Sequence, residues 1–278
     1  MTAARRGALA DAERLALELL AAVTEVSLIA RLTNLLGGIA FEHGRLEEAE
    51  LWLEQVIRSP GAAQNPLLTA RATNNLASIA HLRGKRTLAL SLYQSALMAW
   101  ERENNALGEA QTCHNLGNVA REEGALAEAA EYADRAVLAA ERAEDSALLS
   151  LVLLGRAEVS LARGGWEAAR CDLAAARELA VQTGDALGCA EADRLGGRIA
   201  LAQGLPEEAL RQARLGYRRA NRLGAVQLAG ECAELCTLAS QELRQAALVA
   251  RYRATARRHY AALGAKPSLR RLSNQARR

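Results

Sequence analysis

The chain has 278 residues and a net charge of only +3; half of its residues are hydrophobic, but only 3% are aromatic. A folded core of this composition must consist mainly of Leu and Ala in helices that approach one another closely. The apolar stretch at residues 15–23 is interrupted by Glu18, so we expect neither a membrane span nor an export signal. Five cysteines without a disulfide spacing indicate a reducing compartment, and we expect a soluble cytoplasmic protein.

One pattern returns every 40 residues along the chain. It consists of a β-branched residue, a glycine and an alanine at fixed offsets: Ile39, Ile79, Val119, Val159 and Ile199; Gly44, Gly84, Gly124, Gly164 and Gly204; Ala49, Ala89, Ala129, Ala169 and Ala209. A fixed period of this length is typical of a solenoid, in which each unit buries its apolar face only against its neighbours. The sequence therefore predicts one elongated array.

Each repeat contains the signals of two helices. Leu36, Ile39 and Ala40 recur at helical spacing in the following repeats, and the glycine after them favours the left-handed conformation that ends a helix. The alanine after this turn lies opposite a small residue of the first helix, such as Gly117, which lets the two helices approach closely. Polar residues suited to cap the next first helix also recur every 40 positions: Asn65, Asn105, Asp145 and Asp185.

The pattern divides the chain into four parts. Residues 1–25 are predicted to form an N-terminal capping helix, 26–225 five repeats, 226–263 a degenerate sixth repeat in which Arg244 replaces the glycine, and 264–278 a basic tail. From Gln241 onward there are ten Lys or Arg and one Glu, a local charge of +9. The preceding 240 residues carry 25 basic and 31 acidic residues, a charge of −6, so the chain has a basic end on an acidic body.

The pairing of Leu with Gly or Ala in the first helix, followed by the turn glycine and then alanine, resembles the tetratricopeptide repeat (TPR) family over about residues 26–263. The 40-residue unit is longer than the common 34 residues. It is similar to the subtype found in kinesin light chains, Leu-Gly-Asn-repeat proteins and bacterial TPR regulators. The segment Asn115-Leu116-Gly117-Asn118 also resembles that subtype. The resemblance implies an all-α fold, a right-handed α-solenoid of helix-turn-helix repeats, whose first helices line a concave groove for a peptide or a partner helix.

The stripe of the first helices next to the apolar one should face this groove. Its polar members are the candidate binding residues: Arg31, Asn34, Arg71, Asn74, Ser78, His81, His114, Asn118, Arg121, Arg194 and Arg198. Amide and imidazole groups in successive repeats can pair with the backbone of an extended peptide whatever its side chains. The alternative is that some of these groups, Asn75 and Asn115 above all, bond only to the protein's own backbone.

Arginines at the start of the stripe favour an acidic partner. Arg31, Arg71 and Arg121 could hold carboxylates in bidentate contacts, although a solvated charged face is an equal alternative. The carboxylate clamp of some TPR proteins uses groove lysines; neither lysine of this chain, Lys85 or Lys266, lies in the stripe. We therefore do not expect that clamp.

Enzymatic motifs are missing from the sequence. It contains no glycine-rich phosphate loop, no Ser-His-Asp arrangement and no dinucleotide fingerprint. Cys232 and Cys236 lie on one helical face but have no second pair with ligand spacing, so they are interpreted as buried thiols. We expect no enzyme activity, no cofactor and no metal.

The leading hypothesis is a non-enzymatic interaction scaffold that binds a protein or peptide partner in the groove, where the arginines favour an acidic partner. The alternative is a sensor or regulatory TPR module of a bacterial signalling or transcription system whose basic C-terminus contacts nucleic acid; 33 arginines against two lysines indicate a GC-rich, bacterial genome. Self-assembly through exposed repeat ends is a third hypothesis, and the sequence leaves the oligomeric state open.

Overall fold

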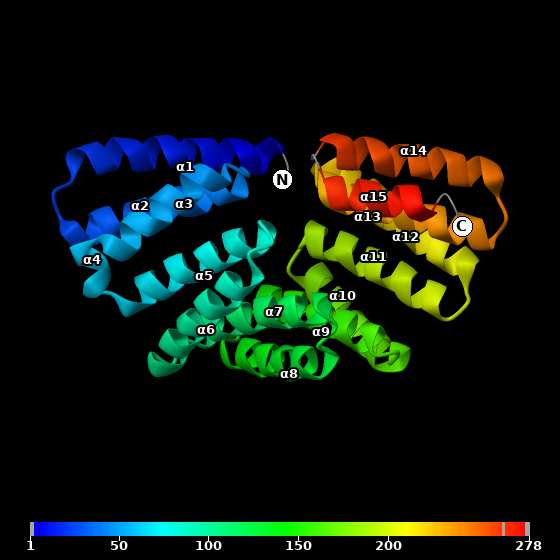
Figure 1. The fold of residues 1–278 in the computed structure, drawn as a ribbon, viewed down its shortest axis with the longest axis horizontal. Coiled ribbons are helices and arrows are strands. Elements are labelled where there is room, and N and C mark those ends of the chain that lie inside the picture. Colours follow the sequence, from blue (N-terminus) through cyan, green and yellow to red (C-terminus); the bar gives the residue numbers. More distant parts are fainter. Residues whose placement is uncertain (1–2, 263–264, 276–278) are drawn as a thin grey trace. The chain divides into compact units, whose positions relative to one another are not determined.

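The computed structural model describes residues 3–262 and 265–275, and all of their regular secondary structure is helical (Figure 1). The helices are α1 Ala3–Ala22, α2 Val26–Glu42, α3 Leu46–Arg58, α4 Pro60–Ala63, α5 Pro66–Leu82, α6 Arg86–Arg102, α7 Ala106–Glu122, α8 Leu126–Arg142, α9 Ser146–Ala162, α10 Trp166–Gln182, α11 Ala186–Ala202, α12 Pro206–Leu223, α13 Val226–Glu242, α14 Ala246–Ala262 and α15 Lys266–Gln275. The predicted all-α repeat solenoid is confirmed.

The 40-residue period has a simple structural origin. From α5 onward most repeats consist of two 17-residue helices, each followed by a three-residue turn. The first repeat departs from this plan because α3 ends after 13 residues, and the one-turn helix α4 begins at Pro60, which has no N–H to continue α3. None of the described helices is both long enough and apolar enough to cross a membrane.

The chain divides into two compact units. The N-terminal unit is Ala4–Leu148 and the C-terminal unit contains Leu149–Arg278, so the boundary falls inside α9. The N-terminal unit holds α1 to α8, and the C-terminal unit holds most of α9 and α10 to α15. Within each unit, consecutive helices pack as antiparallel pairs (Figure 1).

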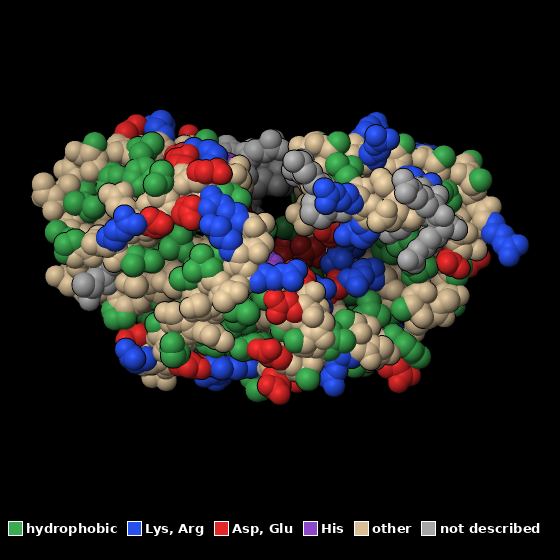
Figure 2. All heavy atoms as spheres, viewed as in Figure 1, with side chains coloured by type: hydrophobic (Ala, Val, Ile, Leu, Met, Phe, Trp, Pro, Cys, Tyr) green, Lys and Arg blue, Asp and Glu red, His purple; other side chains and the backbone are tan. Residues whose placement is uncertain are grey.

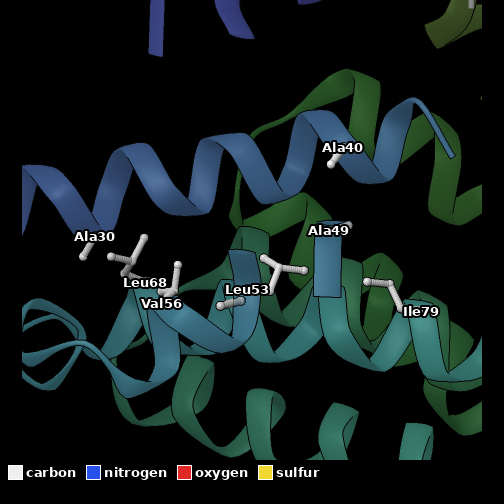
Figure 3. Packing of buried hydrophobic residues seen from close by; sticks show 8 residues of the cluster. Ala30, Ala40, Ala49, Leu53, Val56, Leu68 and Ile79 are labelled. Carbon is white, nitrogen blue, oxygen red and sulfur yellow. The ribbon is translucent and has the colours of Figure 1, made fainter. Parts of the chain in front are cut away.

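Small residues build the core of the N-terminal unit. Figure 3 shows Ala30 and Ala40 of α2 against Ala49, Leu53 and Val56 of α3, with Leu68 and Ile79 of α5 completing the cluster. The N-terminal helix α1 adds a second cluster, in which Ala16 packs on Leu32 and Leu36 of α2. Burial of aliphatic area at about 25 cal/mol per Å² drives this packing, and alanine lets the helix axes come close.

The turns within the repeats follow the predicted glycine pattern. Gly44, Gly84, Gly124, Gly164 and Gly204 all adopt positive φ, between 71° and 82°. At the first of these turns the Gly44 N–H donates to the Phe41 carbonyl and the Arg45 N–H donates to the Ala40 carbonyl. These are the two hydrogen bonds of a Schellman motif. Arg244 takes the same left-handed conformation in the sixth repeat, with φ of 55°, although it is not a glycine.

The predicted helix caps and small contacts are also confirmed. The side chains of Asn65, Asn105, Asp145 and Asp185 each accept a hydrogen bond from a backbone N–H in the first turn of the next helix, at 2.8–3.1 Å. A Cβ placed on Gly117 would lie 3.4 Å from the Ala129 carbonyl oxygen, and one on Gly197 would lie 3.1 Å from that of Ala209. The recurrent alanine and the small residue therefore do face each other.

The end of the C-terminal unit contains more structure than a tail. Residues 266–275 form α15, which buries Leu272 against Ala233, Ala256 and Tyr260 of α13 and α14. On the same helix, Arg271 makes a bidentate contact with Glu234 of α13, at 2.7 and 2.8 Å. One leucine and one ion pair thus order a segment whose composition alone does not predict a helix.

Candidate functional site: the polar face of the first helices

The first helices of successive repeats are neighbours within each unit. In the N-terminal unit α2 contacts α5 and α5 contacts α7; in the C-terminal unit α11 contacts α13. We call the predicted binding stripe on these helices the polar face; it consists of the eleven candidate residues together with Glu158, Glu191, Glu231 and Glu234 at the same repeat positions. Basic and acidic side chains are interspersed over the visible surface of both units (Figure 2), so charge pairing decides what each part of the polar face can bind.

Asn74 is anchored to the interior of the N-terminal unit. Its Oδ1 accepts a hydrogen bond of 3.0 Å from the Thr112 hydroxyl, which in turn accepts one of 3.1 Å from the Trp100 indole N–H. Thr112 and Trp100 are both buried. This relay fixes the orientation of the amide and leaves its NH2 group as the donor available to another molecule.

Asn118 and His114 form a second polar pair one helix further along. The Asn118 Nδ2 donates to the His114 Nε2 over 3.0 Å. Burial, with a smaller contribution from the positive charge of Arg121, lowers the pKa of His114 to about 4, so the ring is neutral at pH 7. Because Nε2 accepts from the amide, the proton of the neutral ring lies on Nδ1, and the Asn118 Oδ1 is the remaining acceptor of the pair.

Three further candidates have mixed surroundings. The Ser78 hydroxyl faces the second helix of its own repeat, where it bonds to the Tyr93 hydroxyl at 3.0 Å, so it is committed to the interior. The His81 Nε2 lies 3.4 Å from a Glu122 carboxylate oxygen, whereas its buried Nδ1 has no hydrogen-bond partner. The Nε of Arg121 is likewise buried and without a partner.

Asn34 occupies the same repeat position as Asn74 but lacks its partner. It is 7% exposed, and its Oδ1 makes no hydrogen bond. Ala72 stands in the same relation to Asn34 as Thr112 does to Asn74, and it has no hydroxyl group to donate. The structure therefore places Asn34 in the interior, away from the surface that the other candidates share.

The three arginines on the polar face of the N-terminal unit differ from most other arginines of this unit, such as Arg45 and Arg83, which are paired with glutamates. Among the described residues, no carboxylate oxygen lies within 4.0 Å of the guanidinium nitrogens of Arg31, Arg71 or Arg121. Arg31 and Arg71 are exposed and Arg121 is half-buried. The polar face of this unit therefore carries positive charge next to neutral amide and imidazole groups.

The polar face of the C-terminal unit is different, because its arginines already hold an internal carboxylate. Arg194 and Arg198 of α11 both contact Glu158 of α9, the first at 2.8 Å, and Glu158 is only 7% exposed. Arg194 also lies 3.4 Å from Glu231 of α13. Burial raises the pKa of Glu191 on the same face, and the positive charge of Arg194 opposes this shift. These contacts hold α9, α11 and α13 together.

The sequence predicts the members of the polar face but not their partners within the protein. It identified Asn74, His114 and Asn118, whereas Thr112, Trp100 and the double role of Glu158 depend on contacts between residues 12 to 40 positions apart. Glu158 and Arg198 carry opposite charges at the same position of successive repeats, and this was the one available signal for the ion pairs; Arg194 lies one helical turn before Arg198.

No protein-family model and no curated protein matches the sequence. Solved structures match by shape. A Rap protein complexed with Competence and Sporulation Factor has a TM-score of 0.67 over 91% of this chain and 75% of that one, at 10% identity. The STAND protein with a tetratricopeptide repeat sensor from Pyrococcus horikoshii has a TM-score of 0.61 over 94% of this chain and 42% of that one, at 14% identity.

A third similar structure is a putative kinesin light chain from Podosopora anserina with nearly identical TPR-like repeats. Its TM-score is 0.53 over 73% of this chain and all of that one, at 16% identity. The fold is thus that of a helical-repeat solenoid. Within this class it is the TPR type, which confirms at the level of the fold the resemblance that the sequence predicted.

Proposed function

We propose that the protein is a non-enzymatic interaction scaffold and that the polar face of its N-terminal unit binds an acidic, extended segment of a partner protein. The observation that carries this proposal is that Arg31, Arg71 and Arg121 have no carboxylate partner within the described part of the chain, and that Arg121 lies near the neutral His114–Asn118 pair. The Asn118 Oδ1 and the Asn74 NH2 would pair with the peptide backbone, and the guanidinium groups would select negative side chains.

A preformed surface supports this role. The Asn74 amide is held by Thr112 and the His114 ring by Asn118, so binding would not have to order these side chains first. The Rap protein provides a parallel, since its structure holds Competence and Sporulation Factor on the same type of fold. The polar face of the C-terminal unit is the weaker candidate because Arg194 and Arg198 are occupied by Glu158.

A peptide-selection experiment tests the proposal. Random peptides displayed on phage are selected on the purified chain, and the dissociation constants of the selected peptides are measured by fluorescence anisotropy. We expect enrichment of Asp and Glu, and a loss of affinity of about tenfold or more per arginine in an Arg71→Ala/Arg121→Ala variant, since a hydrogen bond to a charged group contributes about 1.5–3 kcal/mol.

The matched control is Arg163→Ala/Arg170→Ala in the C-terminal unit. Both of these arginines are exposed and have no carboxylate within 4.0 Å in the described part of the chain, so this variant loses the same charge at another surface. Peptides that bind both variants equally, or a selection without acidic residues, would contradict the proposal.

The alternative role is a sensor or regulatory module of a bacterial signalling system. It is favoured by the similarity in fold to the STAND protein, whose repeats are named a sensor and of which this chain spans 42%. A sensor of this kind acts through other domains. Binding of a selected peptide to the polar face would then be one step of signalling rather than the assembly of a complex.

A further inference from the structure

The second helices of the last two repeats, α12 and α14, are unusually basic. After Glu208 the rest of α12 contains no acidic residue, and α14 contains none at all. Over the same stretch they carry Arg211, Arg214, Arg218, Arg219 and Arg222 in α12 and Arg251, Arg253, Arg257 and Arg258 in α14. This feature lies on other helices than the polar face and does not depend on the proposed function.

Two contacts place α12 and α14 side by side. The Arg214 Nε donates to the Tyr252 hydroxyl at 2.8 Å, and the Tyr217 and His259 rings meet edge to face with centroids 5.9 Å apart. The guanidinium carbons of Arg214 and Arg251 lie 5.6 and 5.8 Å from the centroid of the same Tyr252 ring. Positive charges from both helices are thus gathered in one area.

Internal ion pairs neutralise only part of this charge. Arg211 is held by Glu208 at 2.6–2.8 Å, and Arg219 by the buried Asp193 at 2.6 Å. The others that reach solvent have no carboxylate within 4.0 Å among the described residues, and we call them the basic face: Arg218, Arg222, Arg251, Arg257 and Arg258. Arg218 and Arg258 occupy the same position of successive repeats, so their side chains leave neighbouring helices on the same side.

The surroundings of the basic face indicate what kind of anion it suits. Protein interfaces are built around a buried apolar or aromatic centre, but no large hydrophobic residue beyond Leu205 is exposed in the described part of the chain. Recognition of single strands relies on exposed aromatic rings for base stacking. Tyr252 and Tyr260 are only 8% and 1% exposed, and the half-buried rings of Tyr217 and His259 pack on each other. What remains is a set of guanidinium groups that can contact phosphates.

We propose that the basic face binds the sugar-phosphate backbone of double-stranded nucleic acid without reading its sequence. Arg218 and Arg222 of α12, with Arg251 and Arg258 of α14, would each contact a phosphate. Binding of this kind releases counterions. The logarithm of the association constant therefore falls linearly with the logarithm of the salt concentration, with a slope of about −0.9 per phosphate contact. Four contacts give an affinity loss of about 100-fold between about 50 and 200 mM salt.

The test measures fluorescence anisotropy of labelled duplexes of about 20 base pairs with the full chain, using DNA and RNA of the same sequence in parallel. We expect binding that is independent of sequence and steeply dependent on salt, with the two arms showing which duplex geometry is preferred. An Arg218→Glu/Arg258→Glu variant should lose about tenfold or more in affinity and show a salt slope smaller by about 2. An Arg218→Lys/Arg258→Lys variant, which keeps the charge, should retain both.

The control variant Arg163→Glu/Arg170→Glu makes the same change in net charge elsewhere on the C-terminal unit. Circular dichroism melting checks that all variants are folded. An equal loss in this control would overturn the proposal, because it would show that only net charge matters. A poly-glutamate peptide that binds the basic face as tightly as the duplexes would also overturn it, in favour of an acidic protein partner, and so would unchanged affinity in the Arg218→Glu/Arg258→Glu variant.

Discussion

The N-terminal and C-terminal units carry arginines on the same polar face but in different electrostatic states. In the N-terminal unit the repeat position of Glu158 is occupied by Gly38, Ser78 and Asn118, and among the described residues no carboxylate meets Arg31, Arg71 or Arg121. In the C-terminal unit Glu158 binds both Arg194 and Arg198. On the same type of helix pair, one unit thus leaves its polar-face arginines available for a partner, and the other uses them to hold its own helices together.

The largest expected effect comes from removing the carboxylate that makes this difference. Glu158→Ala leaves Arg198 without its carboxylate and Arg194 with only the longer contact to Glu231, so we expect a loss of about 2–3 kcal/mol in the free energy of unfolding, since breaking a largely buried ion pair strands charge. Urea denaturation, monitored by hydrogen exchange in each unit, would measure this loss in the free energy of unfolding.

Asn118→Ala is the corresponding variant in the N-terminal unit and should cost less than about 1 kcal/mol, because it removes one half-buried hydrogen bond. Equal losses in Glu158→Ala and Asn118→Ala would show that the two polar faces do not differ in the way that the contacts indicate.

The next effect separates two amides of the N-terminal unit. Asn74→Ala leaves the buried Thr112 hydroxyl without an acceptor, and we expect a loss of about 1–2 kcal/mol in the free energy of unfolding. The sequence alone predicts that Asn74 and Asn118 are both surface groups and that replacing them with alanine leaves the melting temperature unchanged. The relay to Trp100 makes Asn74 structural as well, so Asn118 is the cleaner probe of binding.

A Thr112→Val/Asn74→Ala double variant tests the cause. Replacing both partners removes the stranded hydroxyl, so its loss should be smaller than the sum of the two single losses. Additive losses would mean that the hydrogen bond between Asn74 and Thr112 is not the source of the effect.

The next effect in size is a pH dependence of stability that originates at His114 in the N-terminal unit. The pKa of His114 is about 4 in the folded protein and about 6.5 in an unfolded chain. The unfolded state therefore binds more protons between these values, and stability that is present above pH 6.5 is lost as the pH falls towards 4. Allowing for the partial exposure of the ring, we expect a loss of about 1–2 kcal/mol in the N-terminal unit. Burial and the charge of Arg258 also lower the pKa of His259 in the C-terminal unit, so a loss of the same sign is expected there.

His114→Gln is the control for this titration. Its amide can still pair with Asn118 but does not titrate, so the difference in stability between pH 7 and pH 4.5 should shrink relative to the unchanged chain. A pH profile that is the same in both proteins would assign the acid sensitivity to other groups.

The repeat architecture could be predicted from sequence because its signals are local. Helix spacing around Leu36 and Ile39, the turn glycines and caps such as Asn105 each act within a few residues, and all are found in the structure. The partners of the candidate site could not be predicted in the same way. Whether an arginine of the polar face is free or paired depends on side chains about 40 residues away, as the contact between Arg198 and Glu158 shows.

The smallest expected effect concerns the turn between the two helices of a repeat. In the N-terminal unit Gly44, Gly84 and Gly124 take positive φ in this turn, whereas the corresponding turn of the sixth repeat, in the C-terminal unit, holds Arg244 at φ of 55°. A side chain in this conformation costs about 1–2 kcal/mol of folding free energy. Glycine removes this cost, but part of the gain is lost because glycine also raises the entropy of the unfolded chain. Arg244→Gly should therefore stabilise the C-terminal unit by about 0.5–1 kcal/mol.

The opposite change in the N-terminal unit completes the test. Gly124 has φ of 78° and open space around it, so Gly124→Ala meets no clash and reports the backbone conformation alone. It should destabilise by about 1 kcal/mol, measured by thermal unfolding together with Arg244→Gly. If both changes shift the melting temperature in the same direction, the left-handed turn is not what distinguishes the two positions, and the side chain of Arg244 must contribute a contact that offsets its strain.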